Sequence, residues 1–245
     1  MIGSAAEPTD LRVRREVVSF VRRSNRMRPN QRRAWEVYRE RFVLDVPRLE
    51  ASTSVHPDAA VDLVDTFGRD AELIVEIGPG AGESLMPIAE ACPDVNLLAF
   101  EVYRPAIARI LGQLARKGLE NVRIVEADAV AGMERLLPAR SIDALWTFFP
   151  DPWPKPRHHK RRLVTPTFAA LAASRMKPGG MWRIATDCAD YADWVREVLD
   201  NAQGFANEHP NGWAPRWQAR PITQFEQRGL DAGRRIFDLA YRRVS

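Results

Sequence analysis

Residues 72–84, ELIVEIGPGAGES, are the stretch of this 245-residue chain that most constrains its fold. Residues 72–78 form a short apolar run closed by a glycine, which is the pattern of a buried β-strand. Gly78, Gly80 and Gly82 have GxGxG spacing, so the backbone can turn tightly and a ligand can approach it closely. The stretch predicts a strand, a ligand-binding turn and the start of a helix. A plain strand-to-helix turn is the alternative.

Similar apolar runs recur along the chain, with helical patterns between them. The runs are residues 95–101, 122–128, 142–149 and 180–187. The helical patterns cover residues 82–91, 104–117, about 129–136, 164–176 and 188–201. This alternation predicts an α/β fold with a doubly wound, mostly parallel sheet that has helices on both faces. Residues 234–243 alternate polar and apolar, which is typical of a late strand, expected to be antiparallel.

Composition excludes several classes of protein. No apolar run approaches the roughly 20 residues that span a bilayer, and the amino terminus lacks an apolar signal core. We therefore expect a cytoplasmic protein without a membrane partner. Cys92 and Cys188 are far apart, and the four histidines lack metal-ligand spacing. We expect neither a disulfide framework nor a metal site.

Positive charge is concentrated in three places, although the net charge is only +4. Residues 11–41 contain eleven arginines, residues 155–162 form a second basic cluster, and a third closes the chain. Clustered arginine with a modest overall charge indicates a localised polyanion site. For any one cluster, a solvated basic face is the alternative. We divide the chain into a basic extension, residues 1–50, expected to be partly disordered, and an α/β domain, residues 51–245.

An acidic residue stands at the end of each expected parallel strand, where such sheets place their ligands. These residues are Glu76, Glu101, Asp128, Asp151 and Asp187. Because Glu83 replaces the third glycine of a dinucleotide-binding loop, a pyrophosphate would be repelled there.

A cationic ligand without phosphate suits this edge better, and S-adenosylmethionine is such a ligand. In that interpretation Glu101 accepts from two ribose hydroxyls and Asp128 from the adenine amino group. Capping of a helix is the alternative role for either acid. The spacing and the sign of the charges thus favour a methyltransferase.

The segment 148–163, FFPDPWPKPRHHKRRL, carries the substrate prediction. Two prolines bracket Asp151 and stiffen its loop, and Phe148, Phe149 and Trp153 supply flat apolar surfaces. A fixed acid among rings is a seat for a purine, and the basic run after it would hold phosphates. A proline-rich surface loop with a charged flank is the alternative.

This segment resembles the signature of the tRNA (guanine-N7-)-methyltransferase family of class I S-adenosylmethionine-dependent methyltransferases. EIGPGAGES at 76–84 and AFEVYRPAI at 99–107 are similar to the family's cofactor segments. RIATDCADYADW at 183–194, TQFEQRG at 223–229 and SFVRRSNRMRPNQRRA at 19–34 resemble its remaining motifs. Gln224 stands where we expect a lysine, and Pro156 interrupts the basic run.

The resemblance implies a Rossmann-like, seven-stranded sheet and methyl transfer to N7 of a guanine in the tRNA variable loop. It implies that Asp151 is the catalytic carboxylate, lying between cofactor and substrate and touching both. It implies that the cofactor is bound by Glu76, Gly78, Gly80, Gly82, Glu101 and Asp128. It implies that the tRNA is contacted by Lys155, Arg157, His158, His159, Lys160, Arg161, Arg162, Asp187, Thr223, Gln224, Phe225 and Glu226. The basic extension is a further expected tRNA contact, and monomer and homodimer stay open.

Guanine N7 has a lone pair and no proton to lose, so the reaction needs no general base. A fixed carboxylate would stabilise the positive charge that grows on the ring. Two other readings remain open from the residues. One is an amino-methyltransferase acting on adenine or cytosine, whose motif has a proline where Trp153 stands. The other is a non-catalytic RNA-binding scaffold, which need not keep Glu76, Glu101 and Asp128. Glu83 disfavours a dehydrogenase.

Overall fold

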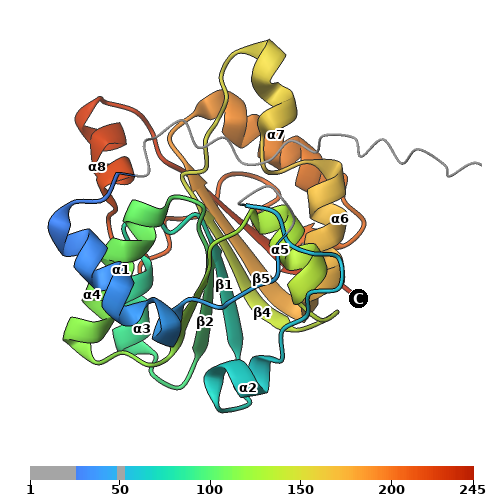
Figure 1. Ribbon diagram of the computed structural model, residues 1–245. Coiled ribbons are helices and arrows are strands. Elements are labelled where there is room, and N and C mark those ends of the chain that lie inside the picture. The colour runs from blue at the N-terminus through green and yellow to red at the C-terminus, as the bar shows by residue number, and fades with distance from the viewer. Residues whose placement is uncertain (1–25, 49–52) are drawn as a thin grey trace, which may run out of the picture.

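The computed structural model describes residues 26–48 and 53–245, and these form a seven-stranded sheet between two groups of helices (Figure 1). The strand order is β3-β2-β1-β4-β5-β7-β6. The parallel strands are β1 (Leu73–Ile77), β2 (Asn96–Phe100), β3 (Val122–Val125), β4 (Ile142–Phe148) and β5 (Met176–Thr186). Strand β7 (Phe237–Arg243) runs antiparallel to β5 and to β6 (Phe205–Asn207). The predicted fold class is confirmed, including the late antiparallel strand.

Strand β5 begins earlier than its sequence pattern indicates. It starts at Met176, and its pairing with β4 shifts register between Ile142 and Ala144. Gly179 has a φ of +83°, and a Cβ on Gly180 would lie 2.9 Å from the carbonyl oxygen of Asp143. A proline and two glycines hide this part of the strand from a pattern search, because such residues normally interrupt strands.

Helices cover both faces of the sheet, and Figure 1 shows the two groups on opposite sides. One face is covered by α1 (Pro29–Phe42), α3 (Leu85–Ala91) and α4 (Arg104–Lys117). The other is covered by α5 (Ala129–Leu136), α6 (Pro166–Arg175) and α7 (Ala189–Asp200). The short helix α2 (Leu63–Phe67) precedes β1. The 3-10 helix η1 (Pro156–Arg161) follows β4, and α8 (Gln224–Asp231) precedes β7.

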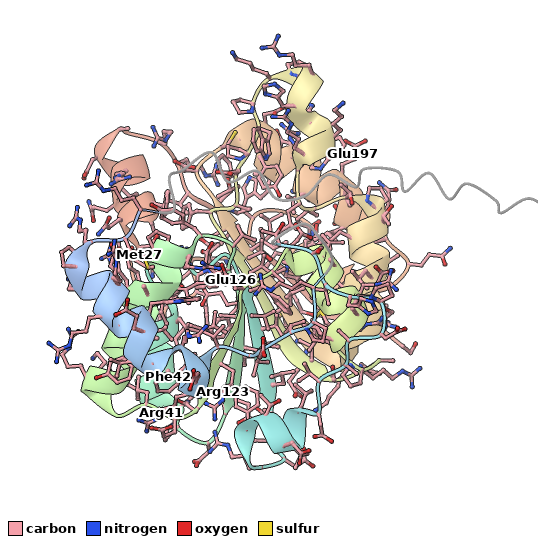
Figure 2. The ribbon with its side chains drawn as sticks, viewed as in Figure 1. Met27, Arg41, Phe42, Arg123, Glu126 and Glu197 are labelled. Atoms are coloured by element: carbon pink, nitrogen blue, oxygen red, sulfur yellow. The ribbon has the colours of Figure 1, made fainter. Side chains whose placement is uncertain are left out.

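Helix α1 packs on the same core as the rest of the domain. Phe42 is 1% exposed and belongs to the hydrophobic cluster of α3 and α4. The side-chain amide of Gln31 donates to the Pro105 carbonyl over 2.9 Å. Figure 2 shows Arg41 and Phe42 at the carboxyl-terminal end of α1, close to Arg123. Burial lowers the pKa of Arg123, and the charge of Arg41 lowers it further. Residues 26–48 are thus tied to the domain, while residues 1–25 and 49–50 of the predicted extension lie outside the described residues.

Each of the helices in residues 26–48 and 53–245 is too short or too polar to cross a membrane.

Candidate active site at the carboxyl edge of the sheet

The glycine-rich turn after β1 needs its three glycines for backbone geometry. Gly78, Gly80 and Gly82 have φ angles of +68°, +57° and +79°, a region that L side chains rarely adopt. A Cβ on Gly82 would also lie 3.0 Å from Cγ1 of Ile110 in α4. The turn therefore lies close to α4 and exposes backbone groups at the strand ends.

Glu76, near the end of β1, has one carboxylate oxygen without a partner. The residue is 2% exposed, and its Oε1 accepts a hydrogen bond from Ser84 Oγ. Its buried Oε2 has no hydrogen-bond partner among the described residues. Burial raises the pKa of Glu76 to about 7, and the nearby charge of Glu101 adds to the rise. A buried acid in this state suits a cationic ligand that would donate to it.

Glu101, at the end of β2, holds the glycine-rich turn. Its Oε2 accepts from the Gly80 amide over 3.1 Å, and its Oε1 accepts from the amides of Val102 and Tyr103, both over 2.8 Å. Asp128, beyond β3, caps α5 by accepting from the amides of Val130 and Ala131 over 3.0 and 3.2 Å. The capping role considered for Asp128 is therefore observed. Both acids lie at the same edge as Glu76, because β2 and β3 run parallel to β1 in the same sheet.

Asp151 lies on an exposed turn between β4 and η1 that has unusual backbone geometry. Phe149 and Trp153, two residues to either side, have φ angles of +52° and +45°. For bulky residues such angles cost about 1–3 kcal/mol each and persist only where the surrounding structure enforces them. Burial raises the pKa of the Tyr191 phenol, and the charge of Asp151 adds to the rise, so the two groups lie near each other. The strained turn fixes where the carboxylate of Asp151 is presented.

The basic run after Asp151 forms η1 and is not uniformly exposed. Lys155, Arg157 and Lys160 are exposed, while His158, His159 and Arg161 are half-buried. The Arg161 guanidinium lies 5.0 Å from the centre of the Trp153 ring, and His158 meets the same ring edge-on at 5.8 Å. These contacts pack η1 onto the turn that carries Asp151.

Arg162 differs from its basic neighbours because its side chain points inward. The residue is 3% exposed, and its guanidinium lies 5.4 and 5.2 Å from the rings of Tyr191 and Trp194. Nε donates to the Pro152 carbonyl over 3.1 Å, and Nη2 donates to Asp190. The geometry gives Arg162 a bracing role on the Asp151 turn.

Helix α8, which begins at the second residue of the TQFEQRG motif, is tied to two strand ends. The Thr223 hydroxyl caps the helix by accepting from the Glu226 amide over 3.2 Å. The backbone amide of Gln224 donates to the Glu83 carboxylate in the glycine-rich turn over 2.5 Å. At the other end, Asp187 after β5 accepts from Arg234 over 2.8 Å and lies against Gly229. The helix therefore links the ends of β1 and β5.

The motif's side chains have different surroundings. Phe225 is 50% exposed, and Gln224 is exposed beside it. Glu226 is buried and forms ion pairs with Arg216 and Arg220.

Several residues of this edge were not identified from the sequence. Ser84 carries the hydrogen bond to Glu76, and Arg220 pairs with Glu226. Arg104 donates from Nε and Nη2 to the buried Glu126, over 2.9 and 3.1 Å, and Figure 2 labels Glu126. Only the pairing of opposite charges could have indicated Arg220 and Arg104, and their separations from their partners follow no local period. Among the described residues, no group of three or more histidine, cysteine, aspartate or glutamate side chains could hold a metal ion.

Comparisons with known proteins agree on a methyltransferase. A family model described as "Putative methyltransferase" matches residues 70–239. The chain is 49% identical to the tRNA (guanine-N(7)-)-methyltransferase of Cutibacterium acnes, over 99% of this chain and 89% of that protein. It is 48% identical to the enzyme of the same name from a Nocardioides species, over 96% of this chain and 90% of that protein.

Solved structures of low sequence identity share the fold. The 16S rRNA methyltransferase KamB has a TM-score of 0.54 and 16% identity, covering 79% of this chain and 99% of that one. The antibiotic-resistance methyltransferase Kmr has a TM-score of 0.52 and 18% identity, covering 82% of this chain and 98% of that one.

Proposed function

The chain belongs to the tRNA (guanine-N(7)-)-methyltransferase family, and from that premise we propose that the guanine it methylates lies in the variable loop of tRNA. The enzyme transfers a methyl group from S-adenosylmethionine to N7 of guanine in tRNA. The family assignment carries this conclusion, and the strained turn that presents Asp151 is the structural observation that supports it most. The amino-methyltransferase and scaffold readings are not favoured.

The residues after β1, β2 and β3 fit S-adenosylmethionine. The unpartnered oxygen of Glu76 can accept from an ammonium group, and the turn leaves space beside Gly78 and Gly80 for a ligand close to the backbone. Glu101 would accept from the ribose hydroxyls and Asp128 from the adenine amine. When bound, the cofactor supplies an electrophilic methyl group on a sulfonium.

We assign to Asp151 the role of a fixed anion beside the acceptor base. Guanine N7 attacks through its own lone pair, so the carboxylate need not remove a proton. It accepts instead from the guanine N1–H and exocyclic amine and stabilises the positive charge that develops on the ring. The left-handed geometry of Phe149 and Trp153 supports this role, because it persists only where the surrounding structure holds the turn in place before the substrate arrives.

The tRNA contacts divide between η1 and α8. The exposed and half-buried cations after Asp151 would bind backbone phosphates, and they are Lys155, Arg157, His158, His159, Lys160 and Arg161. Asp187, Gln224 and Phe225 would contact the substrate beside them. Arg162, Thr223 and Glu226 are buried, so the proposal gives them positioning roles. Because the substrate is tRNA, the proposal places the reaction in the cytoplasm.

Mapping the methylated atom tests the function. Bulk unmodified tRNA is incubated with the protein and labelled S-adenosylmethionine, digested to nucleosides and analysed by mass spectrometry. The expected product is 7-methylguanosine, located in the variable loop by sequencing of the labelled fragment. Label on an exocyclic amine of adenine or cytosine would overturn the proposal. 7-Methylguanosine outside the variable loop would overturn only the position.

A further inference from the structure

Arg220 carries a charge in a fully buried position between α8 and the sheet. Its side chain is 0% exposed. Nη1 donates to Glu226 over 2.8 Å, and Nη2 donates to both carboxylate oxygens of Asp238 over 2.9 and 3.0 Å. Burial lowers the pKa of Arg220, and its two acidic partners oppose that effect. A buried charge with this pairing connects the elements that supply its partners.

Those partners belong to two separate elements. Glu226 lies in the first turn of α8, and Asp238 lies in β7. Arg216 binds both carboxylate oxygens of Glu226, over 2.7 and 3.1 Å, and also donates to the Arg220 carbonyl over 2.8 Å. The pairing therefore fixes the start of the helix relative to the sheet.

The same guanidinium also contacts the turn that carries Asp151. Its central carbon lies 5.4 Å from the ring centres of both Phe148 and Phe149, at the end of β4. The backbone of Phe149 has a φ of +52°, and Asp151 follows two residues later. Arg220 therefore packs against the strained residue that sets the direction of the turn.

The hydrogen bonding of Arg220 is not the arrangement that would maximise stability. Its Nε is buried and has no hydrogen-bond partner among the described residues. An unsatisfied buried donor is unfavourable, and buried ion pairs are weak stabilisers compared with well-packed apolar groups. The geometry is better explained by a function that needs this group at the junction of α8 and β4.

We infer that Arg220 is a positioning residue. Its buried guanidinium fixes the position of the Asp151 turn relative to α8, the helix that contains most of the TQFEQRG motif. This inference rests on the proposed function. Binding of tRNA at α8 and presentation of Asp151 would then depend on one rigid connection. A displacement of the reacting groups by about 1 Å costs roughly 100-fold in rate, so a small change at Arg220 should be measurable in turnover.

Arg220→Lys tests the inference because it keeps the charge and loses the planar fork. Lysine cannot bind both acids in the same geometry or stack on two rings. We expect kcat for tRNA methylation to fall by roughly 100-fold, while calorimetric affinity for S-adenosylmethionine stays at the wild-type value. Kinetics are measured well below the melting temperature of each variant, so that loss of stability does not contribute.

A matched control is Arg196→Lys. Arg196 in α7 also binds an acid, Asp200, and lies 5.5 Å from the Trp213 ring. Its other hydrogen bonds are to the carbonyls of Gly212 and Pro210, away from the Asp151 turn. Its replacement should leave kcat at the wild-type value. Equal losses in the two variants would overturn the inference, because both would then reflect general destabilisation.

Phe149→Leu tests the connection from the other side and also serves if Arg220→Lys does not fold. Its kcat should fall, and the double variant should be no slower than the slower single variant, since both changes break one contact. A wild-type kcat in Arg220→Lys or in Phe149→Leu, or losses that multiply in the double variant, would overturn the inference alone. A wild-type protein that does not methylate tRNA would overturn the proposed function and the inference with it.

Discussion

At the scale of single residues, the burial and hydrogen-bond partners of an acid affect its role as much as its position in the sequence does. Sequence reasoning identified Glu76, Glu101 and Asp128 from their places at strand ends, and the structure gives the three acids different surroundings. Glu101 accepts three backbone hydrogen bonds, Asp128 caps a helix, and Glu76 is buried with one oxygen unpartnered. These differences depend on burial and on Ser84, and neither could be predicted from the spacing of the acids.

Glu76 gives a pH-dependent prediction with a defined sign. Its pKa is raised from 4.5 to about 7 in the folded protein, so the unfolded chain loses this proton at lower pH than the folded one does. As the pH rises from 4.5 to about 7, this group therefore lowers the free energy of unfolding of the ligand-free protein by about 3 kcal/mol. Glu76→Gln, which keeps the acceptor for Ser84, should melt higher than wild type at about pH 8.

The same variant should bind S-adenosylmethionine more weakly, because it cannot offer a charge to the ammonium group. Differential scanning calorimetry without ligand and titration calorimetry with it measure the two effects. The difference in melting temperature should shrink at about pH 5, where wild-type Glu76 is protonated in the folded state. A variant less stable than wild type at about pH 8, or one with unchanged cofactor affinity, would contradict this account of Glu76.

At the scale of elements, the basic 3-10 helix η1 has an outer and an inner side. Sequence reasoning treated its cations as one group, because the run KPRHHKRR contains no apolar residue that would indicate which side faces inward. The structure separates Arg161, beside Trp153, from Arg162, which is buried against Tyr191 and Trp194.

Replacing Arg162 should therefore affect stability, whereas replacing Arg161 should affect tRNA binding. Arg162→Ala should lower the free energy of unfolding by about 2 kcal/mol, because it removes a charged donor to the Pro152 carbonyl. Arg161→Ala should change stability by at most about 1 kcal/mol, raise KM for tRNA and flatten its salt dependence. Denaturant unfolding and methylation kinetics at two salt concentrations measure both. The same stability loss in the two variants would contradict the assigned orientations.

The elements that sequence reasoning missed have identifiable reasons. Helix α1 lies among arginines and has few apolar positions, and contacts with α4 rather than periodicity stabilise it. Strand β6 has three residues, too few for an alternating pattern to be visible. By contrast, α4 was predicted with its observed bounds, because its apolar stripe is continuous and Gly118 ends it in a left-handed conformation.

At the scale of the whole molecule, the carboxyl edge is divided between two tasks. The ends of β1, β2 and β3 carry the acids proposed to hold the cofactor. The end of β4, with η1 and α8, carries the groups proposed to hold tRNA. The parallel topology could be predicted from the sequence and places all strand ends on one edge. The connections across that edge, such as Glu83 to Gln224 and Arg220 to Asp238, join residues far apart in sequence and needed the structure.

The central claim is that the negative charge of Asp151 accelerates methyl transfer and contributes little to the affinity for the cofactor. Single-turnover transfer to tRNA at saturating S-adenosylmethionine, measured for wild type and Asp151→Asn, tests it most directly. The matched control is Asp94→Asn, an exposed acid before β2. The account predicts a rate lower by roughly 100-fold or more in Asp151→Asn, with cofactor affinity and the control unchanged. A near wild-type rate in Asp151→Asn would contradict it.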